Sequence, residues 1–387
     1  MKILVVLTYY RPHTSGLTIY AERLARAMAQ RGHQVTILTS QYLKELPREE
    51  VMDGIRVVRA PVLLRINKGV IMPTFGFLAT RLVLENDVIH LHLPQFDAAG
   101  LAIRGRLFRK PTVVTYHCDL LLPKGFINWL VNQAVHLMNR ITGIFTHRIV
   151  AYTRDYAEHS PFISKFTSKL EVINPPVIIS NVQPEEVKQF KVQFNGERRI
   201  PVIGMAARFA TEKGVEVLLN AAPEIIKRYP RAVFWFAGPY ENIIGEEKYY
   251  ERLKPRIELL QNNGQWKFLG LLSPRSMAAF YPNLDVLVIP SLNSTESFGL
   301  VQIEAMMSGV PSIASDLPGV RQPVLRHKMG RVIPIGDAGA LAQAVTELIA
   351  EKKEYGSTPK ALRELYAPDT IAQEYEQLFE RIKTEIN

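Results

Sequence analysis

The sequence predicts an α/β protein made of two doubly wound domains, each with a parallel sheet between layers of helices. Short apolar runs rich in β-branched residues recur along both halves of the chain, and helical segments lie between them. Such runs are typical of strands that are buried on both faces of a sheet. The length of 387 residues also suits two large domains, since an average domain has roughly 150 residues.

The first half contains a series of expected strands and one clear helix. The strands are residues 3–7, 35–38, 55–58, 88–91, 112–116 and 149–152. Between the first two, Leu17, Tyr20 and Leu24 recur at helical spacing, which predicts a helix over residues 17–31 that ends before Gly32. A strand, a helix and a second strand in this order form a βαβ unit, whose strands are parallel.

The second half repeats this alternation after a segment of different composition. Its expected strands are residues 200–205, 233–237, 266–269, 286–289 and 312–314, with a helix over 215–228. The preceding residues 174–199 are rich in proline and charge, which indicates a domain boundary. We therefore predict a first domain over 1–185, a second over 186–368, and a C-terminal helix over 369–387 that packs back toward the first domain.

The composition excludes several protein classes and favours an anionic partner. With 47% hydrophobic and 22% charged residues, the chain is not expected to be disordered, collagen-like or a coiled coil. Its formal net charge of +10 favours nucleic acid, a membrane or a phosphorylated substrate as partner. A single cysteine, Cys118, cannot form an internal disulfide, which favours the cytoplasm. The apolar residues 1–8 are too few for a signal peptide or a membrane span, so we expect membrane association to be peripheral.

The segment 290–311 contains two glutamates that could bind an extended ligand. A polar loop follows the strand that ends at Ile289, and a helix is predicted to begin near Ser297. Glu296 would then lie at the positive end of that helix, which is an anion site. It would be next to backbone N–H groups that have no intrahelical partner, those of Ser297, Phe298, Gly299 and Leu300. Glu304 follows two turns later, about 12 Å along a continuous helix, so the two carboxylates could hold opposite ends of one ligand.

A second loop, directly after the strand 200–205, carries two cations. Arg208 and Lys213 precede the helix over 215–228. A guanidinium can bind a phosphate through two parallel hydrogen bonds, and an ammonium acts as a point charge. Either residue alone would be an ordinary surface cation. Their shared loop and the two glutamates downstream favour a diphosphate site.

These two segments together resemble the signature of the glycosyltransferase group 1 family, retaining enzymes of the GT-B fold, in which two Rossmann-like domains face a central cleft. The resemblance implies that Glu296 contacts the transferred sugar in catalysis and that Glu304 binds the ribose hydroxyls. It also implies that backbone amides from 298 to 300 meet the sugar and phosphate, and that Arg208 and Lys213 bind the diphosphate. Ala207 stands where the family more often has glycine.

Four further positions are assigned to the site through the same resemblance. Gly16 follows the first strand, where the family usually has two glycines and this chain has Ser15 before one; a glycine there lets a phosphate approach the backbone. His117 resembles the catalytic histidine that faces the donor sugar, although a lone histidine is more often structural. Gly238 and Leu271 lie in loops that read the base and the hexose in the family.

The sequence predicts neither a metal site nor a cofactor. It contains no Asp-x-Asp pair, no Cys-rich or His-rich ligand set, and no phosphate loop of the G-x-x-x-x-G-K-[ST] type. Arg208, Lys213 and the helix N-terminus would therefore stabilise the leaving nucleoside diphosphate. The resemblance implies a UDP- or GDP-sugar as donor and a front-face substitution in which the leaving phosphate helps deprotonate the acceptor.

The first domain is basic and contains an amphipathic helix. Residues 125–145 place Leu130, Leu137 and Ile141 on one helical face, with Trp129 near the start, which is typical either of a core helix or of one that lies on a membrane. Residues 1–185 hold 22 Lys and Arg against 13 Asp and Glu, or +9, whereas residues 186–387 hold 25 against 24, or +1. The excess charge favours an anionic membrane surface and a lipid-linked or glycan acceptor at this domain, and no nucleic acid. Seven cations face one carboxylate between residues 98 and 150: Arg104, Arg106, Arg109, Lys110, Lys124, Arg140 and Arg148.

The leading hypothesis is a cytoplasmic enzyme, peripheral on the inner face of the membrane, that transfers a hexose with retention to an acceptor hydroxyl in envelope polysaccharide or glycolipid biosynthesis. The sequence leaves two alternative functions open. A sugar-nucleotide epimerase on the same fold would isomerise its substrate without an acceptor. A non-enzymatic binder of membrane or nucleic acid would need basic residues interleaved with exposed aromatics or a recognised module, and the sequence contains neither.

Overall fold

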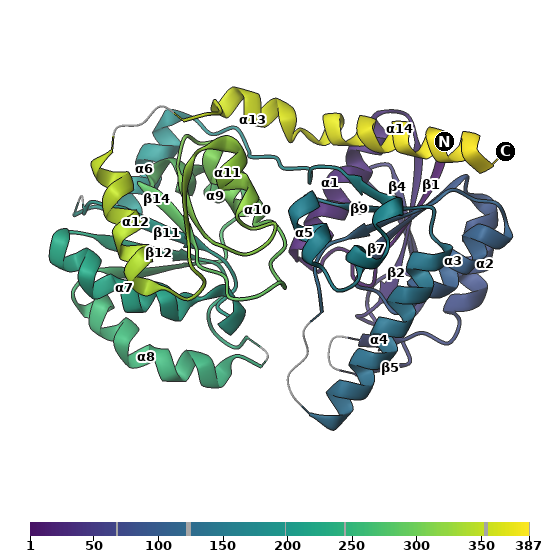
Figure 1. Ribbon diagram of the computed structural model, residues 1–387, viewed down its shortest axis with the longest axis horizontal. Helices are drawn as coiled ribbons and strands as arrows, with labels where there is room; N and C mark the ends of the chain where they lie inside the picture. The colour runs from purple at the N-terminus through teal and green to yellow at the C-terminus, as the bar shows by residue number, and fades with distance from the viewer. Residues whose placement is uncertain (67–68, 121–124, 198, 244, 352–354, 387) are drawn as a thin grey trace. The chain divides into compact units, whose positions relative to one another are not determined.

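The chain forms two compact α/β units (Figure 1). The computed structural model describes residues 1–66, 69–120, 125–197, 199–243, 245–351 and 355–386. Unit 1 comprises Met1–Pro176 and Tyr366–Asn387, and unit 2 comprises Val177–Leu365. Each unit has its own mainly parallel sheet with helices around it, which confirms the predicted class.

Unit 1 is built on an eight-stranded sheet with the order β10-β9-β8-β7-β1-β2-β4-β3. Neighbouring strands are parallel except for the antiparallel pair β3 and β4. Every residue of β7 and β8 is buried, as expected for central strands covered on both faces. The strands are β1 (Lys2–Val6), β2 (Gln34–Gln41), β3 (Glu49–Met52), β4 (Ile55–Pro61), β7 (Val88–Leu93), β8 (Thr112–Tyr116), β9 (Arg148–Ala151) and β10 (Leu170–Val172).

The helices of unit 1, apart from the C-terminal one, lie between successive strands, and a separate small hairpin precedes the second of them. The hairpin consists of β5 (Leu64–Ile66) and β6 (Gly69–Ile71). The helices are α1 (Gly16–Gln30), α2 (Phe75–Glu85), α3 (Ala98–Leu107), α4 (Phe126–Phe145), α5 (Arg154–His159) and α14 (Pro368–Ile386), with short 3-10 turns at Ile163–Lys165 and Thr167–Lys169. Among the described residues, no helix has both the length and the apolar character needed to span a bilayer.

The C-terminal helix α14 belongs to unit 1, where it packs against α1 (Figure 1). The hydroxyl of Tyr375 lies 2.8 Å from that of Tyr20 and 2.6 Å from that of Thr115. At the surface, Glu376 accepts from the guanidinium of Arg31 at 2.6 Å. The return of this helix to the first half of the chain was predicted from its apolar face and is confirmed.

Unit 2 is built on a six-stranded, fully parallel sheet with the order β13-β12-β11-β14-β15-β16. Every residue of β12, β14 and β15 is buried. The strands are β11 (Val202–Ala206), β12 (Val233–Ala237), β13 (Trp266–Gly270), β14 (Val286–Ile289), β15 (Ser312–Ser315) and β16 (Gly330–Ile333). The helices are α6 (Pro184–Phe194), α7 (Val215–Arg228), α8 (Glu247–Asn262), α9 (Pro274–Phe280), α10 (Leu300–Met306), α11 (Gln322–His327), α12 (Ala338–Ala350) and α13 (Pro359–Leu365).

In each sheet the strand order changes direction beside the first strand of the unit. β1 lies between β2 and β7, and β11 lies between β12 and β14. Ligands of open α/β sheets generally bind beyond the carboxyl ends of the strands at such a point. The loops that follow β11 and β14 are therefore the expected position of a ligand site in unit 2.

Candidate active site

The predicted donor-site residues of unit 2 lie beyond the carboxyl ends of four adjacent strands. Arg208 and Lys213 follow β11, Gly238 follows β12, Leu271 follows β13 and Glu296 follows β14. These strands are neighbours in the order β13-β12-β11-β14. Because parallel strands all end at the same edge of a sheet, the fold brings these residues to one edge of unit 2.

The loops after β11 and β14 are in direct contact. The carbonyl of Glu212 accepts from the N–H of Leu292 at 2.9 Å. Gly214 has φ +72°, and a Cβ at this position would lie 1.9 Å from the carbonyl oxygen of Pro290. Only glycine permits this backbone conformation together with so close an approach. The two loops are therefore held together by their backbones, independently of the side chains that they present.

Lys213 and Glu296 form an ion pair between these two loops. The Nζ atom of Lys213 lies 2.7 Å from Oε2 of Glu296, and the side chains are 20% and 22% exposed. Burial alone would lower the pKa of Lys213, but the carboxylates of Glu296 and Glu212 outweigh burial and raise it. Lys213 is therefore charged at neutral pH. The sequence predicted both residues as parts of one site, and the structure brings them together.

Arg208 also has a carboxylate partner. Its guanidinium lies 2.5 Å from Oε1 of Glu212 on the same loop. Burial would raise the pKa of Glu212, but a backbone N–H and the charge of Arg208 lower it overall, so the carboxylate is ionised at neutral pH. Both cations assigned to a diphosphate thus pair with carboxylates of the protein itself.

The helix beyond Glu296 begins later than predicted. The pattern predicted a start near Ser297, whereas α10 begins at Leu300. Gly299 has φ +77°, a left-handed conformation that cannot continue a helix, so the chain from Glu296 to Gly299 is a turn. One of its N–H groups already has a partner, because that of Gly299 donates to Oε1 of Glu296 at 3.0 Å. The estimate of separation along a continuous helix from Glu296 to Glu304 therefore does not hold.

A buried glutamine that was not singled out from the sequence stabilises this turn. Gln302 is 0% exposed, and its Nε2 donates to the carbonyls of Phe298 and Val320, each at 2.9 Å. Its Oε1 accepts from the hydroxyl of Ser312 at 3.2 Å. Ser297 and Phe298 are also buried. Gln302 thus ties the turn, through the Phe298 carbonyl, to Val320 and to Ser312 of β15.

Glu304 lies on α10 and accepts a hydrogen bond from Tyr281. The phenol of Tyr281 is completely buried, and its oxygen lies 2.7 Å from Oε2 of Glu304. Tyr281 lies in a 3-10 turn, Tyr281–Asn283, just before β14. Nothing in the sequence pattern distinguished it from other apolar core residues. It orients a carboxylate that the resemblance assigns to ribose.

Gly238 and Leu271 occupy the neighbouring strand ends for different physical reasons. Gly238 has φ +134°, and a Cβ there would lie 2.0 Å from the carbonyl oxygen of Ala207. Its N–H donates to the carbonyl of Gly270 at 2.8 Å. Glycine is therefore required here by backbone packing alone. Leu271 is 77% exposed, so its side chain is available to a ligand.

His117, the residue predicted in unit 1, is buried in a cluster of polar aromatic groups. It is 6% exposed. Its Nδ1 is hydrogen-bonded to the hydroxyl of Tyr152, and its Nε2 lies 2.9 Å from Nδ1 of His92. Burial, with a smaller contribution from His92, lowers the pKa of His117 well below its usual range, so the imidazole is neutral. To bind a sugar hydroxyl, His117 would have to exchange one of these hydrogen bonds.

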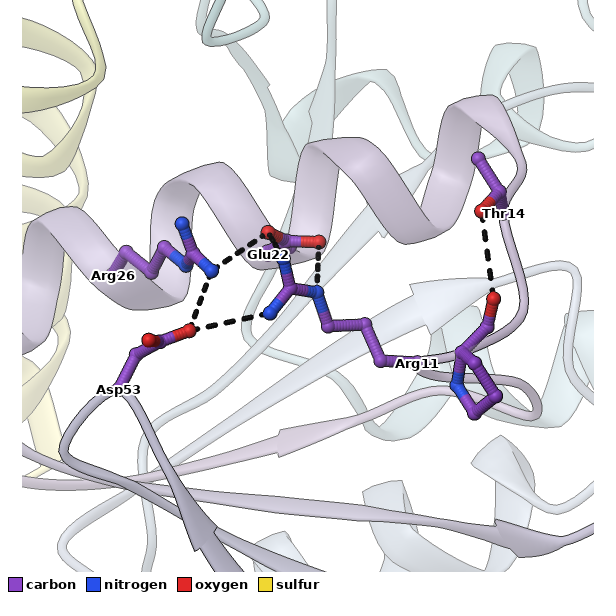
Figure 2. Close-up of polar contacts among 6 residues, drawn as sticks. Arg11, Thr14, Glu22, Arg26 and Asp53 are labelled. Carbon is purple, nitrogen blue, oxygen red and sulfur yellow. Dashed lines mark hydrogen bonds and ion pairs between the residues drawn. The ribbon is translucent and has the colours of Figure 1, made fainter. Parts of the chain in front are cut away.

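Gly16 is the first residue of α1, and the loop before it is fastened by a charged network (Figure 2). Arg11 donates to Glu22 at 2.8 Å and to Asp53 at 3.2 Å, and Arg26 reaches the same Asp53 oxygen at 2.5 Å. A Cβ at Gly16 would meet no atom within 4 Å. Packing therefore does not demand a glycine at this position, and space remains beside the helix start. The network joins residues far apart in sequence and was not predicted.

Across the described ranges, no three His, Cys, Asp or Glu side chains are grouped in a way that could hold a metal ion. The charged groups described above at the edge of unit 2 include two cations and the two carboxylates paired with them, and Glu304 lies further along the chain on α10. Such a set can bind an anion through Arg208 and Lys213 and hydroxyl groups through the carboxylates.

Comparison with known proteins identifies the family. Residues 185–364 match the family described as glycosyl transferases group 1, and residues 14–180 match glycosyltransferase family 4. The chain is 25% identical over 370 residues to the GDP-mannose-dependent alpha-mannosyltransferase of Mycolicibacterium smegmatis, covering 92% of this chain and 91% of the relative. It is 23% identical over 396 residues to the phosphatidyl-myo-inositol mannosyltransferase of Mycobacterium leprae, covering 99% and 98%.

The fold is that of solved GT-B structures. The crystal structure of HepE from Anabaena in complex with UDP superposes with a TM-score of 0.75 over 98% of this chain and all of that one, at 20% identity. The enzyme class comes from the two family models, which describe glycosyltransferases as the resemblance implied, and not from this likeness of fold. The two matched models together cover most of the chain, which belongs to the glycosyltransferase group 1 and family 4 enzymes, retaining transferases that take a sugar from a nucleotide-sugar donor.

Proposed function

We propose that this enzyme transfers a hexose from a UDP- or GDP-sugar to a hydroxyl of a lipid-linked or membrane glycolipid acceptor, without a metal ion, at the inner face of the cytoplasmic membrane. Glu296 would contact the transferred hexose, Glu304 the ribose, and the backbone from Ser297 to Leu300 the phosphates. Gly238 and Leu271 would border the base and the sugar. Gly16 and His117 would contribute from unit 1.

The observation that supports this proposal most strongly is the pairing of Lys213 with Glu296 at 2.7 Å between the loops after β11 and β14. A cation for the diphosphate and a carboxylate for the sugar are thereby next to each other, as the two halves of a nucleotide sugar are. Arg208 lies on the same loop as Lys213. The relative named for GDP-mannose and the HepE structure with UDP make these two bases the first to test.

In the proposed step, the bond between the anomeric carbon and the β-phosphate oxygen breaks as the acceptor oxygen bonds to the same face of that carbon. The acceptor proton passes to the departing phosphate oxygen, so that atoms and charges balance. Positive charge develops on the sugar ring and is opposed by the Glu296 carboxylate. Arg208 and Lys213 stabilise the negative charge that gathers on the diphosphate.

A thermal-shift screen against UDP- and GDP-sugars tests the donor assignment. A ligand that binds only the folded protein raises the unfolding temperature in a concentration-dependent way. We expect one base to stabilise the protein and the other to have little effect. No stabilisation by any nucleotide sugar or nucleoside diphosphate at millimolar concentration would refute the proposed donor class.

The proposed membrane surface is formed by α3 and α4 of unit 1. α4 packs against α3 and still leaves large apolar side chains exposed. This exposure supports a helix that lies on a membrane rather than one buried in the core. Exposed cations flank them, among which Arg109 and Arg140. Lys124 lies outside the described residues. The exposed large apolar side chains are Ile103, Leu107, Phe126, Trp129, Leu130, Val131, Leu137 and Ile144.

We expect Arg109→Gln with Arg140→Gln to weaken binding to anionic vesicles. Each cation near an anionic leaflet contributes about 1 kcal/mol, so that the pair should change the partition coefficient by about tenfold or more. Flotation with vesicles of phosphatidylglycerol and of phosphatidylcholine measures the effect.

The matched control removes two exposed cations from unit 2, Lys227→Gln with Lys248→Gln, and should bind like the wild type. Equal lack of binding of the wild type to both kinds of vesicle would refute the membrane proposal. An effect of the unit 2 control as large as that of the unit 1 variant would show that only net charge matters.

A further inference from the structure

Glu212 forms an ion pair with Arg208, the residue that the proposed function assigns to the donor diphosphate. The Oε1 atom of Glu212 lies 2.5 Å from the guanidinium of Arg208, and the two side chains are 18% and 38% exposed. A guanidinium binds a carboxylate and a phosphate through the same N–H groups. Glu212 uses the Nη2 group of Arg208, so a diphosphate that binds Arg208 through this group must compete with Glu212.

Backbone contacts hold the loop that carries Glu212 in place, and Arg208 reaches Glu212 with a long, flexible side chain. The carbonyl of Glu212 accepts from Leu292 at 2.9 Å, and the neighbouring Gly214 packs against Pro290. Arg208 is more exposed than Glu212 and can therefore turn outward more readily. Exchange of partners requires a rotation of the arginine side chain and no movement of either loop.

The charges around Arg208 are balanced when no ligand is bound. Lys213, the next residue along the chain, pairs with Glu296 at 2.7 Å. Without a ligand the four groups Arg208, Glu212, Lys213 and Glu296 carry two positive and two negative charges, which cancel. A bound diphosphate that uses both cations would leave the two carboxylates without their ion-pair partners, and this loss opposes its binding.

We propose that Glu212 is a gating carboxylate, which takes up Arg208 as the nucleoside diphosphate leaves and thereby weakens binding of the product. This inference rests on the proposed function in one respect, that Arg208 binds the diphosphate of the donor. Glu212 touches neither the sugar nor the reacting atoms and is a positioning residue for Arg208. A free nucleoside diphosphate has one more ionisable phosphate oxygen than the nucleotide sugar, so it can use more of the Arg208 N–H groups, and competition from Glu212 weakens its binding more than that of the donor.

Calorimetric titration of UDP and GDP into the full-length protein tests the proposal. We expect Glu212→Gln to bind the preferred nucleoside diphosphate about tenfold more tightly than the wild type, since one competing hydrogen-bonded charge is removed. The affinity for the nucleotide sugar should rise less. The product-inhibition constant should fall in proportion to the dissociation constant, with the KM for donor changing less than either.

A double-mutant cycle separates an effect through Arg208 from a general effect of charge. Arg208→Gln should weaken binding, and Arg208→Gln with Glu212→Gln should bind no more tightly than Arg208→Gln alone. Glu216→Gln is the matched control, because Glu216 is a neighbouring glutamate that pairs with Arg252 at 2.6 Å on the surface. It should bind like the wild type. Glu212→Ser provides a second variant of the same position.

The outcomes are distinguishable. If the wild type binds a nucleoside diphosphate and both Glu212 variants, folded by thermal melt, bind it equally or more weakly, the gating role is wrong and the proposed function stands. If Glu212→Gln tightens binding by the same factor with and without Arg208, the effect is general repulsion and the gating role is likewise wrong. A wild type that binds neither nucleoside diphosphate overturns the proposed function and the gating role together.

Discussion

Glu296→Gln is expected to lower the rate of sugar transfer by about a hundredfold to a thousandfold, the range seen when one preorganised electrostatic group is removed from a transition state. The amide keeps the size of the carboxylate and can still accept the N–H of Gly299, so the turn before α10 should survive. What is lost is the negative charge beside the sugar. Initial rates with saturating donor measure the change.

Binding of the nucleoside diphosphate should respond in the opposite sense. Because Lys213 loses its carboxylate partner in Glu296→Gln, it is freed for the diphosphate, and affinity should be unchanged or higher. Glu216→Gln again serves as control for a glutamate outside the site. Near-normal turnover by Glu296→Gln would contradict the catalytic role assigned to this carboxylate.

Gly214→Ala is expected to destabilise unit 2 by about 3 kcal/mol or more, a size typical of a strained backbone combined with overpacking. The new Cβ would lie 1.9 Å from the carbonyl oxygen of Pro290. The loops after β11 and β14 would have to separate, which would also pull Lys213 away from Glu296. We therefore expect a lower unfolding temperature by calorimetry and weaker donor binding in the same variant.

Gly270→Ala is the control that separates backbone strain from collision. Gly270 has φ +68°, close to that of Gly214, but a Cβ there would meet nothing within 4 Å. Its cost should be only that of the left-handed conformation, about 1–2 kcal/mol. Equal losses in the two variants would mean that the contact with Pro290 contributes nothing.

Buried strands and helices could be predicted from the sequence where an apolar run is continuous. The strands β8, β12 and β14 and the helix α7 have the predicted bounds. The strands that were missed, such as β3, β10 and β16, are terminal in their sheets. Their residues alternate between exposed and half-buried or are mostly half-buried, so no apolar run distinguishes them from loops.

Candidate site residues could be proposed from the sequence, but their partners could not. A loop position after a strand indicated Arg208 and Lys213, and helix-end chemistry indicated Glu296. That Lys213 pairs with Glu296 and Arg208 with Glu212 depends on how two loops pack, which no local pattern encodes. Gln302 and Tyr281 were missed for the same reason, since in sequence each is one polar group within an apolar segment.

For His117, likewise, the position in the fold could be predicted but the hydrogen-bond partners could not. Its place after β8 followed from the predicted strand, but its hydrogen-bond partners lie on the neighbouring strand β7, which holds His92, and directly after β9, where Tyr152 follows Ala151. Only the assembled sheet shows that both ring nitrogens are occupied. Its role toward a donor sugar stays a prediction.

The central claim is that Lys213 and Arg208 hold the donor diphosphate in unit 2 without a metal ion. Calorimetric titration of the donor identified by the thermal-shift screen, in the presence of EDTA, tests it most directly. We expect saturable binding by the wild type that EDTA does not change, and a loss of affinity of about tenfold to a hundredfold in Lys213→Gln, the size of a lost charged hydrogen bond. Binding that EDTA abolishes, or that Lys213→Gln leaves unchanged, would contradict it.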